Sequence, residues 1–189
     1  MSDKDGKFNK PERGSSPLPD HIMLSFWGDA KTSAAISWRT DENSGDSYIL
    51  YRREGSADLL RQEAVTRFAE TDIDRSNYHW VRLSGLEPGC KYCYTVGDDE
   101  HRSGEFTFET EPEKLDKFSF IVISDHQKGS PCHLPDYSMV GEMLKTALAK
   151  HPECRFIFTA GDNCDNGQND LQWNGMFELS LIHISEPTR

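Results

Sequence analysis

The sequence predicts two consecutive structural classes, an antiparallel β-sandwich followed by a strand–helix–strand unit of the α/β type. Short runs of alternating apolar and polar residues, separated by turn residues, continue to about Thr110, and strands at this spacing are typical of a sandwich. After Pro112, two almost continuously apolar runs enclose a segment with helical periodicity, which is the pattern of a parallel βαβ unit.

The predicted sandwich consists of five alternating runs. They cover residues 33–40, 47–53, 77–83, 90–97 and 105–110. Successive side chains of a strand point to opposite faces, so Ile36 and Trp38 are expected on one buried face. Tyr92, Tyr94 and Val96 are expected on another for the same reason.

The second predicted unit begins with the apolar run "FSFIVIS" (118–124), and "RFIFTA" (155–160) follows later. Runs of this kind indicate strands buried on both faces. The segment between them, 136–150, is expected to be a helix with Asp136 as its N-cap, and the two strands are therefore expected to be parallel. The apolar residues at helical spacing are Met139, Val140, Met143, Leu144, Ala147 and Leu148.

Each of the two predicted parallel strands ends in an aspartate. Asp125 follows the first strand and Asp162 the second, at the carboxyl edge where open α/β sheets bind their ligands. Two facing carboxylates repel each other and require a neutralising partner, and Lys128 is the only nearby base. Hard carboxylate oxygens favour metal cations. The alternative is that Gly161-Asp162 is an ordinary turn and Asp125 a cap.

The segment Leu86-Glu-Pro-Gly-Cys-Lys-Tyr92, with Val96 after it, resembles the corner that opens the sixth strand of fibronectin type III domains. In that corner the Tyr hydroxyl bonds back to the backbone. The longer stretch "YHWVRLSGLEPGCKYCYTVGD", together with "FTFETEP", resembles the N-terminal fibronectin-type domain of purple acid phosphatases and related bacterial metallophosphoesterases. The resemblance implies an immunoglobulin-like sandwich over residues 17–112.

The stretches "VISD" and "AGDNCDNGQNDLQW" resemble the first two metal-binding blocks of calcineurin-like metallophosphoesterases, the family that includes purple acid phosphatases. The resemblance implies that Asp125 binds one metal and that Asp162 bridges two. The implied cofactors are two divalent or trivalent ions, Fe, Mn or Zn. Two such ions polarise the phosphoryl oxygens and supply a metal-bound hydroxide that hydrolyses phosphate mono- or diesters.

Two positions depart from this family pattern. Asp165 stands where purple acid phosphatases have the Tyr that gives them their colour, so a purple protein is not expected. Gln127 stands where relatives without that Tyr usually carry His, and its amide oxygen is expected to be a weaker ligand. His126 is as well explained by binding a metal as by lying beside the metal ligands or facing solvent.

The end of the chain differs from the family. The later ligands of the family, an Asn-His pair and further histidines, are absent, and the last eleven residues, 179–189, resemble the translated read-through of a sequencing adapter. Residues 117–178 are therefore expected to be a partial catalytic domain, C-terminally truncated and inactive by itself. The alternative for the tail is an amphiphilic terminal strand.

Composition restricts the partners. The 32 Asp and Glu against 21 Lys and Arg leave a net charge of −11, which argues against nucleic acid and anionic membranes. The partner that the family resemblance implies is a phosphate ester. The N-terminal residues, of which 1–16 are predicted to be a disordered arm, contain no apolar region of a secretory signal. The five cysteines fit a reducing compartment, so a cytoplasmic location is expected. The alternative functions are a non-enzymatic fibronectin-type interaction module and a pseudoenzyme. The sequence does not predict an oligomeric state.

Overall fold

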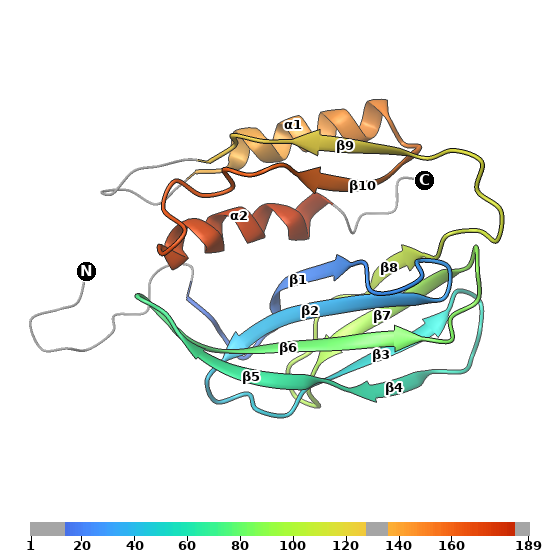
Figure 1. Cartoon of the computed structure of the whole chain (residues 1–189). Helices are drawn as coiled ribbons and strands as arrows, with labels where there is room; N and C mark the ends of the chain where they lie inside the picture. Colours follow the sequence, from blue (N-terminus) through green and yellow to red (C-terminus); the bar gives the residue numbers. More distant parts are fainter. Residues whose placement is uncertain (1–13, 128–135, 184–189) are drawn as a thin grey trace, which may run out of the picture. The chain divides into compact units, whose positions relative to one another are not determined.

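The computed structural model describes residues 14–127 and 136–183 (Figure 1). The chain divides into two compact units. The sandwich unit comprises Ser15–Glu70 and Arg75–Leu115, and the α/β unit contains the chain from Asp116 onward together with Thr71–Asp74.

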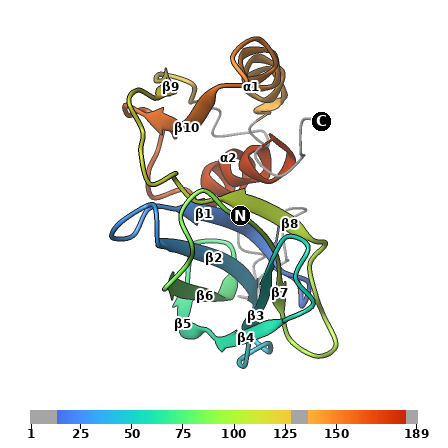
Figure 2. The same ribbon diagram turned by 90° about the vertical axis from the view of Figure 1, so that its right-hand side faces the viewer.

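The sandwich unit has two four-stranded antiparallel sheets, which confirms the predicted class (Figures 1 and 2). The first sheet has the strand order β1-β2-β6-β5 and the second β4-β3-β7-β8. The strands are β1 (Asp20–Ser25), β2 (Ser33–Asp41), β3 (Tyr48–Arg53), β4 (Leu60–Glu63), β5 (Val65–Glu70), β6 (Arg75–Ser84), β7 (Lys91–Gly97) and β8 (Phe106–Glu109).

The five predicted runs correspond to β2, β3, β6, β7 and β8, whereas β1, β4 and β5 were not predicted. These three strands are edge strands of the two sheets. The side chains of β4 and β5 are mostly exposed, and the register of β1 shifts between Asp20 and Met23. An edge strand that buries few side chains can be folded without a regular alternation of apolar and polar residues. The pattern that identifies strands in a sequence is then missing.

The predicted sandwich faces are confirmed, because Ile36, Trp38, Tyr92, Tyr94 and Val96 are all buried. The indole of Trp38 is 1% exposed, and its Nε1–H donates to Ser47 Oγ at 3.0 Å. The Tyr92 ring stacks on Phe108 with 5.4 Å between the ring centroids. The sandwich therefore has a closed aromatic and aliphatic core.

Order in the sandwich unit begins within the predicted arm. Ser15 is buried, and its hydroxyl donates to the Arg75 carbonyl at 3.4 Å. The carbonyl of Ser16 accepts the Asp41 N–H at 2.9 Å. Residues 1–13 lie outside the described residues, so the predicted arm is described only from residue 14.

The expected tyrosine corner is present. The Glu87 N–H donates to Tyr92 Oη at 2.9 Å, so the hydroxyl of a buried side chain holds the turn that precedes its own strand. Thr110 supports the same turn, because its hydroxyl donates to the Glu87 carbonyl at 2.6 Å and accepts the Cys90 N–H at 2.9 Å. Gly89 has a φ of 64°, a conformation that favours glycine.

A buried histidine joins three strands of the first sheet. His79 on β6 is fully buried, with Nε2 2.7 Å from Thr40 Oγ1 and Nδ1 2.8 Å from Thr66 Oγ1. Its ring stacks on Trp38 at 5.5 Å between centroids. Burial lowers the pKa of His79 to about 4, so the ring is neutral at pH 7.

The α/β unit has the predicted strand–helix–strand order. The parallel strands β9 (Ser119–Ile123) and β10 (Cys154–Thr159) are connected through α1 (Ser138–Lys150), and α2 (Asp170–His183) follows. Figure 2 shows both helices to one side of the two strands. The backbone of α2 includes the first five residues of the predicted artefactual tail, and residues 184–189 lie outside the described residues.

The prediction that β9 and β10 are buried on both faces is wrong for the described part of the unit. Phe120 is 45% exposed, Val122 56% and Phe158 54%, whereas the alternate residues Ile121 and Ile157 are half-buried. Phe120 stacks on the neighbouring Phe156, with 4.9 Å between the ring centroids. The helices cover one face, and no described element of the unit covers the aromatic one.

The predicted N-cap of α1 is displaced by one residue. The cap position is Tyr137, which makes no side-chain capping bond, while Asp136 Oδ1 accepts the Ser138 N–H at 2.9 Å. The carboxylate thus still satisfies a first-turn N–H, although from one position further out. Along the helix Leu144 is buried and Met139 is 76% exposed, so the apolar face is narrower than the spacing predicts.

We expect Tyr92→Phe to lower the free energy of unfolding of the sandwich by about 0.5–1.5 kcal/mol, because the Glu87 N–H loses its acceptor in a part-buried hydrogen bond. Urea unfolding followed by intrinsic tryptophan fluorescence, to which the buried Trp38 contributes, measures this change. Tyr51→Phe is the matched control, since the Tyr51 hydroxyl on β3 has no hydrogen bond within the described residues. Equal losses in the two variants would contradict a role of the corner.

The depressed pKa of His79 predicts a pH-dependent stability. The unfolded chain binds this proton below about pH 6.5 and the folded chain only near pH 4, so stability is full above pH 6.5 and falls as the pH decreases to 4. The loss amounts to about 3 kcal/mol at pH 4. Subtracting the unfolding profile of His79→Gln from that of the wild type isolates this contribution, and parallel profiles would refute the assignment.

Candidate metal site

The candidate site lies at the carboxyl ends of β9 and β10, where the two chain segments stay paired beyond the strands. The arrowheads of both strands point the same way (Figure 1). The Ala160 N–H donates to the Ile123 carbonyl at 2.8 Å, that of Asp125 to Gly161 at 3.4 Å and that of Gln127 to Asp162 at 3.1 Å. The backbones of the two predicted metal-binding turns therefore run side by side.

Both aspartates of the site have a left-handed backbone. The φ angle is 53° at Asp125 and 51° at Asp162. Asp tolerates this region better than most residues, but a non-glycine residue adopts it at a cost in energy. Two such residues at adjacent strand ends form an outlier of the kind that clusters at ligand sites.

The two carboxylates differ in their partners. Asp125 Oδ2 accepts the Ser124 hydroxyl at 2.6 Å. Within the described chain, the Asp162 carboxylate has neither a hydrogen bond nor an ion pair. Lys128, the nearby base, lies outside the described residues. Asp162 is exposed, so water satisfies it, and it remains available to a ligand.

Four buried polar atoms beside the aspartates have no hydrogen-bond partner in the described residues. They are His126 Nδ1, His126 Nε2, Gln127 Oε1 and Asn163 Oδ1. His126 is 9% exposed, and its burial lowers the pKa of the imidazole against the raising effect of Asp125. A neutral imidazole and two amide oxygens are donors suited to a metal ion. These atoms are therefore of donor types that suit a cation.

No three His, Cys, Asp or Glu side chains gather closely enough to hold a metal anywhere in residues 14–127 and 136–183. A cation at these turns would therefore depend on amide oxygens as well as on Asp125 and Asp162. The expected pair of metals has no further ligands in the described chain.

Tyr137 on the described chain stabilises the turn that follows β10. Its hydroxyl donates to the Asn163 carbonyl at 3.2 Å, and the side chain is 2% exposed. Burial raises the pKa of the neighbouring Cys164, so its thiol stays protonated at neutral pH. Asp165, at the position of the tyrosine of purple enzymes, is exposed.

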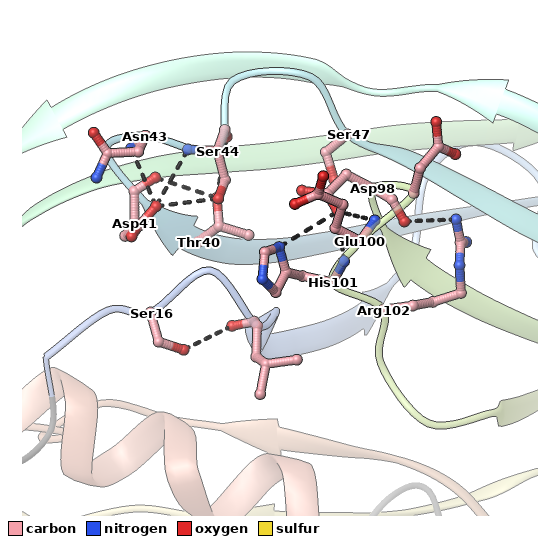
Figure 3. Close-up of polar contacts among 12 residues, drawn as sticks. Ser16, Thr40, Asp41, Asn43, Ser44, Ser47, Asp98, Glu100, His101 and Arg102 are labelled. Carbon is pink, nitrogen blue, oxygen red and sulfur yellow. Dashed lines mark hydrogen bonds and ion pairs between the residues drawn. The ribbon is translucent and has the colours of Figure 1, made fainter.

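Two loops of the sandwich unit show what aspartates in ordinary turns look like (Figure 3). Asp41 Oδ1 accepts the Asn43 N–H at 3.1 Å and the Ser44 N–H at 3.2 Å. Asp98 Oδ1 accepts two N–H groups in the same way, from Glu100 at 2.8 Å and from residue 101 at 2.6 Å. Burial opposes ionisation of Asp98, but these hydrogen bonds outweigh it and lower the pKa. The carboxylate of Asp162 stabilises no turn in this way.

Comparison with known proteins gives the class of the sandwich. Residues 19–110 match the family model of the purple acid phosphatase N-terminal domain. The sandwich is therefore similar to this domain. A search of curated proteins found no match.

Solved structures extend the comparison beyond the sandwich. The structure of PhoD is 12% identical, with a TM-score of 0.56, and the match covers 89% of this chain and 37% of that one. It therefore shares the fold across both units. The third fibronectin III domain of human KIAA0343 protein has 14% identity and a TM-score of 0.38, over 62% of this chain and 99% of that one. A redesigned β-sandwich protein has 16% identity and a TM-score of 0.36, over 51% and 97%.

The helices of the described chain were also compared with the requirements of a membrane span. None combines the length and the apolar character needed to cross a bilayer.

The left-handed backbone predicts which substitutions the site tolerates. Asp162→Asn should leave the stability of the α/β unit within about 0.5 kcal/mol of wild type, because Asn also tolerates this conformation, whereas Asp162→Val should cost about 1–2 kcal/mol. Urea unfolding followed by circular dichroism at 222 nm reports on α1 and α2. Equal stabilities of the two variants would show that the backbone conformation is not left-handed.

Proposed function

We propose that the protein to which this chain belongs is a metal-dependent phosphoesterase that hydrolyses phosphate mono- or diesters. One observation carries the proposal: a sandwich similar to the purple acid phosphatase N-terminal domain precedes a parallel βαβ unit whose two strands end in paired turns with Asp125 and Asp162. The shared fold with PhoD supports this order of units. The chain spans 37% of that neighbour, so the activity is proposed for the longer protein.

The proposed roles follow from the site. Asp125, Asp162 and Gln127 would hold two divalent or trivalent metals, Fe, Mn or Zn, with further ligands from outside the described residues. The metals, when bound, would polarise phosphoryl oxygens and lower the pKa of water. The paired turns keep the two carboxylates at one edge of the sheet, and the left-handed aspartates define where each side chain leaves the backbone.

Charge explains why a metal is needed for this substrate. The protein carries a net charge of −11, and an anionic ester approaches such a surface unfavourably. Among the described residues, no basic side chain pairs with Asp125 or Asp162. A bound cation would both neutralise these carboxylates and attract the phosphate group. The proposed partner is therefore a phosphate ester and not a nucleic acid or a membrane.

The decisive variant is Asp162→Asn in the full-length gene product. We expect the wild type to cleave p-nitrophenyl phosphate with Mn²⁺, Fe²⁺ or Zn²⁺, and the variant to lose roughly a hundredfold or more in kcat/KM, because several kcal/mol of charge stabilisation depend on the metal. Asp58→Asn makes the same charge change at an exposed residue of the sandwich and should leave kcat/KM unchanged. The 189-residue chain alone should cleave p-nitrophenyl phosphate no faster than the metal ions do without protein.

The alternatives give different results in the same assays. An interaction module would contain no metal and show no turnover in either form. A pseudoenzyme would contain metal, measured by elemental analysis, without turnover. Clear turnover by the 189-residue chain alone would contradict the assignment of the missing ligands to residues outside it.

A further inference from the structure

The outer face of the first sheet of the sandwich carries aromatic and cationic side chains that the proposed function does not use. His79 and Val81 on β6 are buried, so the alternate residues Trp80 and Arg82 point away from the core. Trp80 is half-buried and Arg82 is exposed. The strand β6 therefore presents a tryptophan and an arginine on the outside of the sandwich.

The edge strand β5, which runs beside β6 (Figure 1), adds to the same face. Val65 lies directly opposite Trp80, and Arg67 follows two residues later on β5, so both side chains share the outer face. Val65 is 55% exposed, and Arg67 is exposed as well. An apolar side chain and a second arginine thus extend the surface of β6.

The turn between β1 and β2 supplies a second tryptophan. The Arg82 guanidinium lies over the Trp27 ring, 5.2 Å from its centroid, and Trp27 is 40% exposed. The Ser33 hydroxyl contacts the carbonyls of Trp27 and Asp29, which fixes the turn. The term arginine–tryptophan patch is used below for five residues: Trp27, Val65, Arg67, Trp80 and Arg82.

The two arginines of the patch lack the partners that other arginines have. In the described chain, neither the Arg67 nor the Arg82 guanidinium makes an ion pair or a hydrogen bond. The outer positions of β5 and β6 contain no Asp or Glu. Several arginines of the sandwich unit do pair with a carboxylate, namely Arg39, Arg52, Arg53, Arg61 and Arg75. The patch is therefore locally cationic in a protein of net charge −11, and it is complementary to acidic groups.

We propose that the arginine–tryptophan patch binds an extended acidic segment of a partner protein. Trp and Arg are enriched at the centres of protein interfaces. Arg67 lies opposite Tyr78, and Arg82 follows four residues later, so the two arginines are about 13 Å apart along the strand. Side chains i and i+4 of an extended peptide have the same spacing. Two acidic residues would meet the arginines, and the apolar residue midway between them would contact Trp80 and Val65.

The number and spacing of the charges distinguish this partner from others. A nucleic acid or an anionic polysaccharide carries closely spaced charges and needs a row of cations, whereas the patch offers two. A second copy docked face to face would bring the arginines of the two patches together, which is unfavourable. A protein segment with two separated carboxylates matches the patch in both charge and spacing.

Fluorescence anisotropy of the labelled peptide Gly-Asp-Thr-Val-Thr-Asp-Gly with the 189-residue chain tests the proposal. We expect saturable binding, weakened about fivefold or more when both Asp of the peptide are replaced by Asn. Arg67→Gln and Arg82→Gln should each weaken binding about three- to fivefold. Arg61→Gln makes the same charge change on β4 of the other sheet and should bind as the wild type does.

A measurement on the wild type locates the bound peptide without any substitution. In nuclear magnetic resonance spectra, the peptide should shift the indole N–H signals of Trp27 and Trp80 and leave those of Trp38 and Trp173 in place. Shifts confined to Trp38 and Trp173 would overturn the proposal.

Other outcomes also contradict it. Equal affinity for the Asp and Asn peptides, or unchanged binding in both arginine variants, would show that the patch does not recognise acidic groups. Heparin bound more tightly than the peptide and lost in Arg82→Gln would indicate a polyanion instead. Dimerisation of the chain that Arg82→Gln abolishes, measured by sedimentation, would indicate a second copy. None of these results affects the proposed function, which depends on the turns after β9 and β10.

Discussion

The candidate site depends on one interaction, the parallel pairing of β9 and β10, which continues past both strands. Hydrogen bonds from Asp125 to Gly161 and from Gln127 to Asp162 extend the ladder into the turns. Parallel strands end at the same edge of a sheet, so the pairing alone brings both polar turns together. The left-handed aspartates and the atoms without partners in the described residues lie in these two turns.

The two units differ in the hydrogen bonding of their buried polar groups and in the burial of their apolar side chains. In the sandwich, the tyrosine corner, the His79 hydroxyl pair and the Asp41 and Asp98 turns leave buried polar groups bonded within the unit. In the α/β unit, an aromatic sheet face is exposed and polar atoms at the turns lack partners. These groups of the sandwich need no added ligand, whereas the chemistry proposed for the α/β unit requires one.

Ordinary turns and metal turns use the same residue types, and hydrogen bonding distinguishes them. A Gly-Asp or Asp-Asp sequence is compatible with an Asx turn, and Asp98 forms one. Asp162 has the same chemistry but accepts no hydrogen bond from its own turn in the described chain. This contrast is the reason why ligand binding is proposed at Asp162 and not at Asp98.

The sequence by itself determined both classes of structure, the five strands with clear alternation, the corner at Tyr92 and the placement of Asp125 and Asp162 at strand ends. These features depend on local periodicity and on turn residues, which a sequence displays directly. Only the tertiary structure decided the edge strands β1, β4 and β5, the exposed face of β9 and β10, and the condition of His126 and Asn163. The pairing of edge strands, the burial of one sheet face and the absence of hydrogen-bond partners depend on which segments lie next to each other in space. The periodicity of residues along the chain does not specify this.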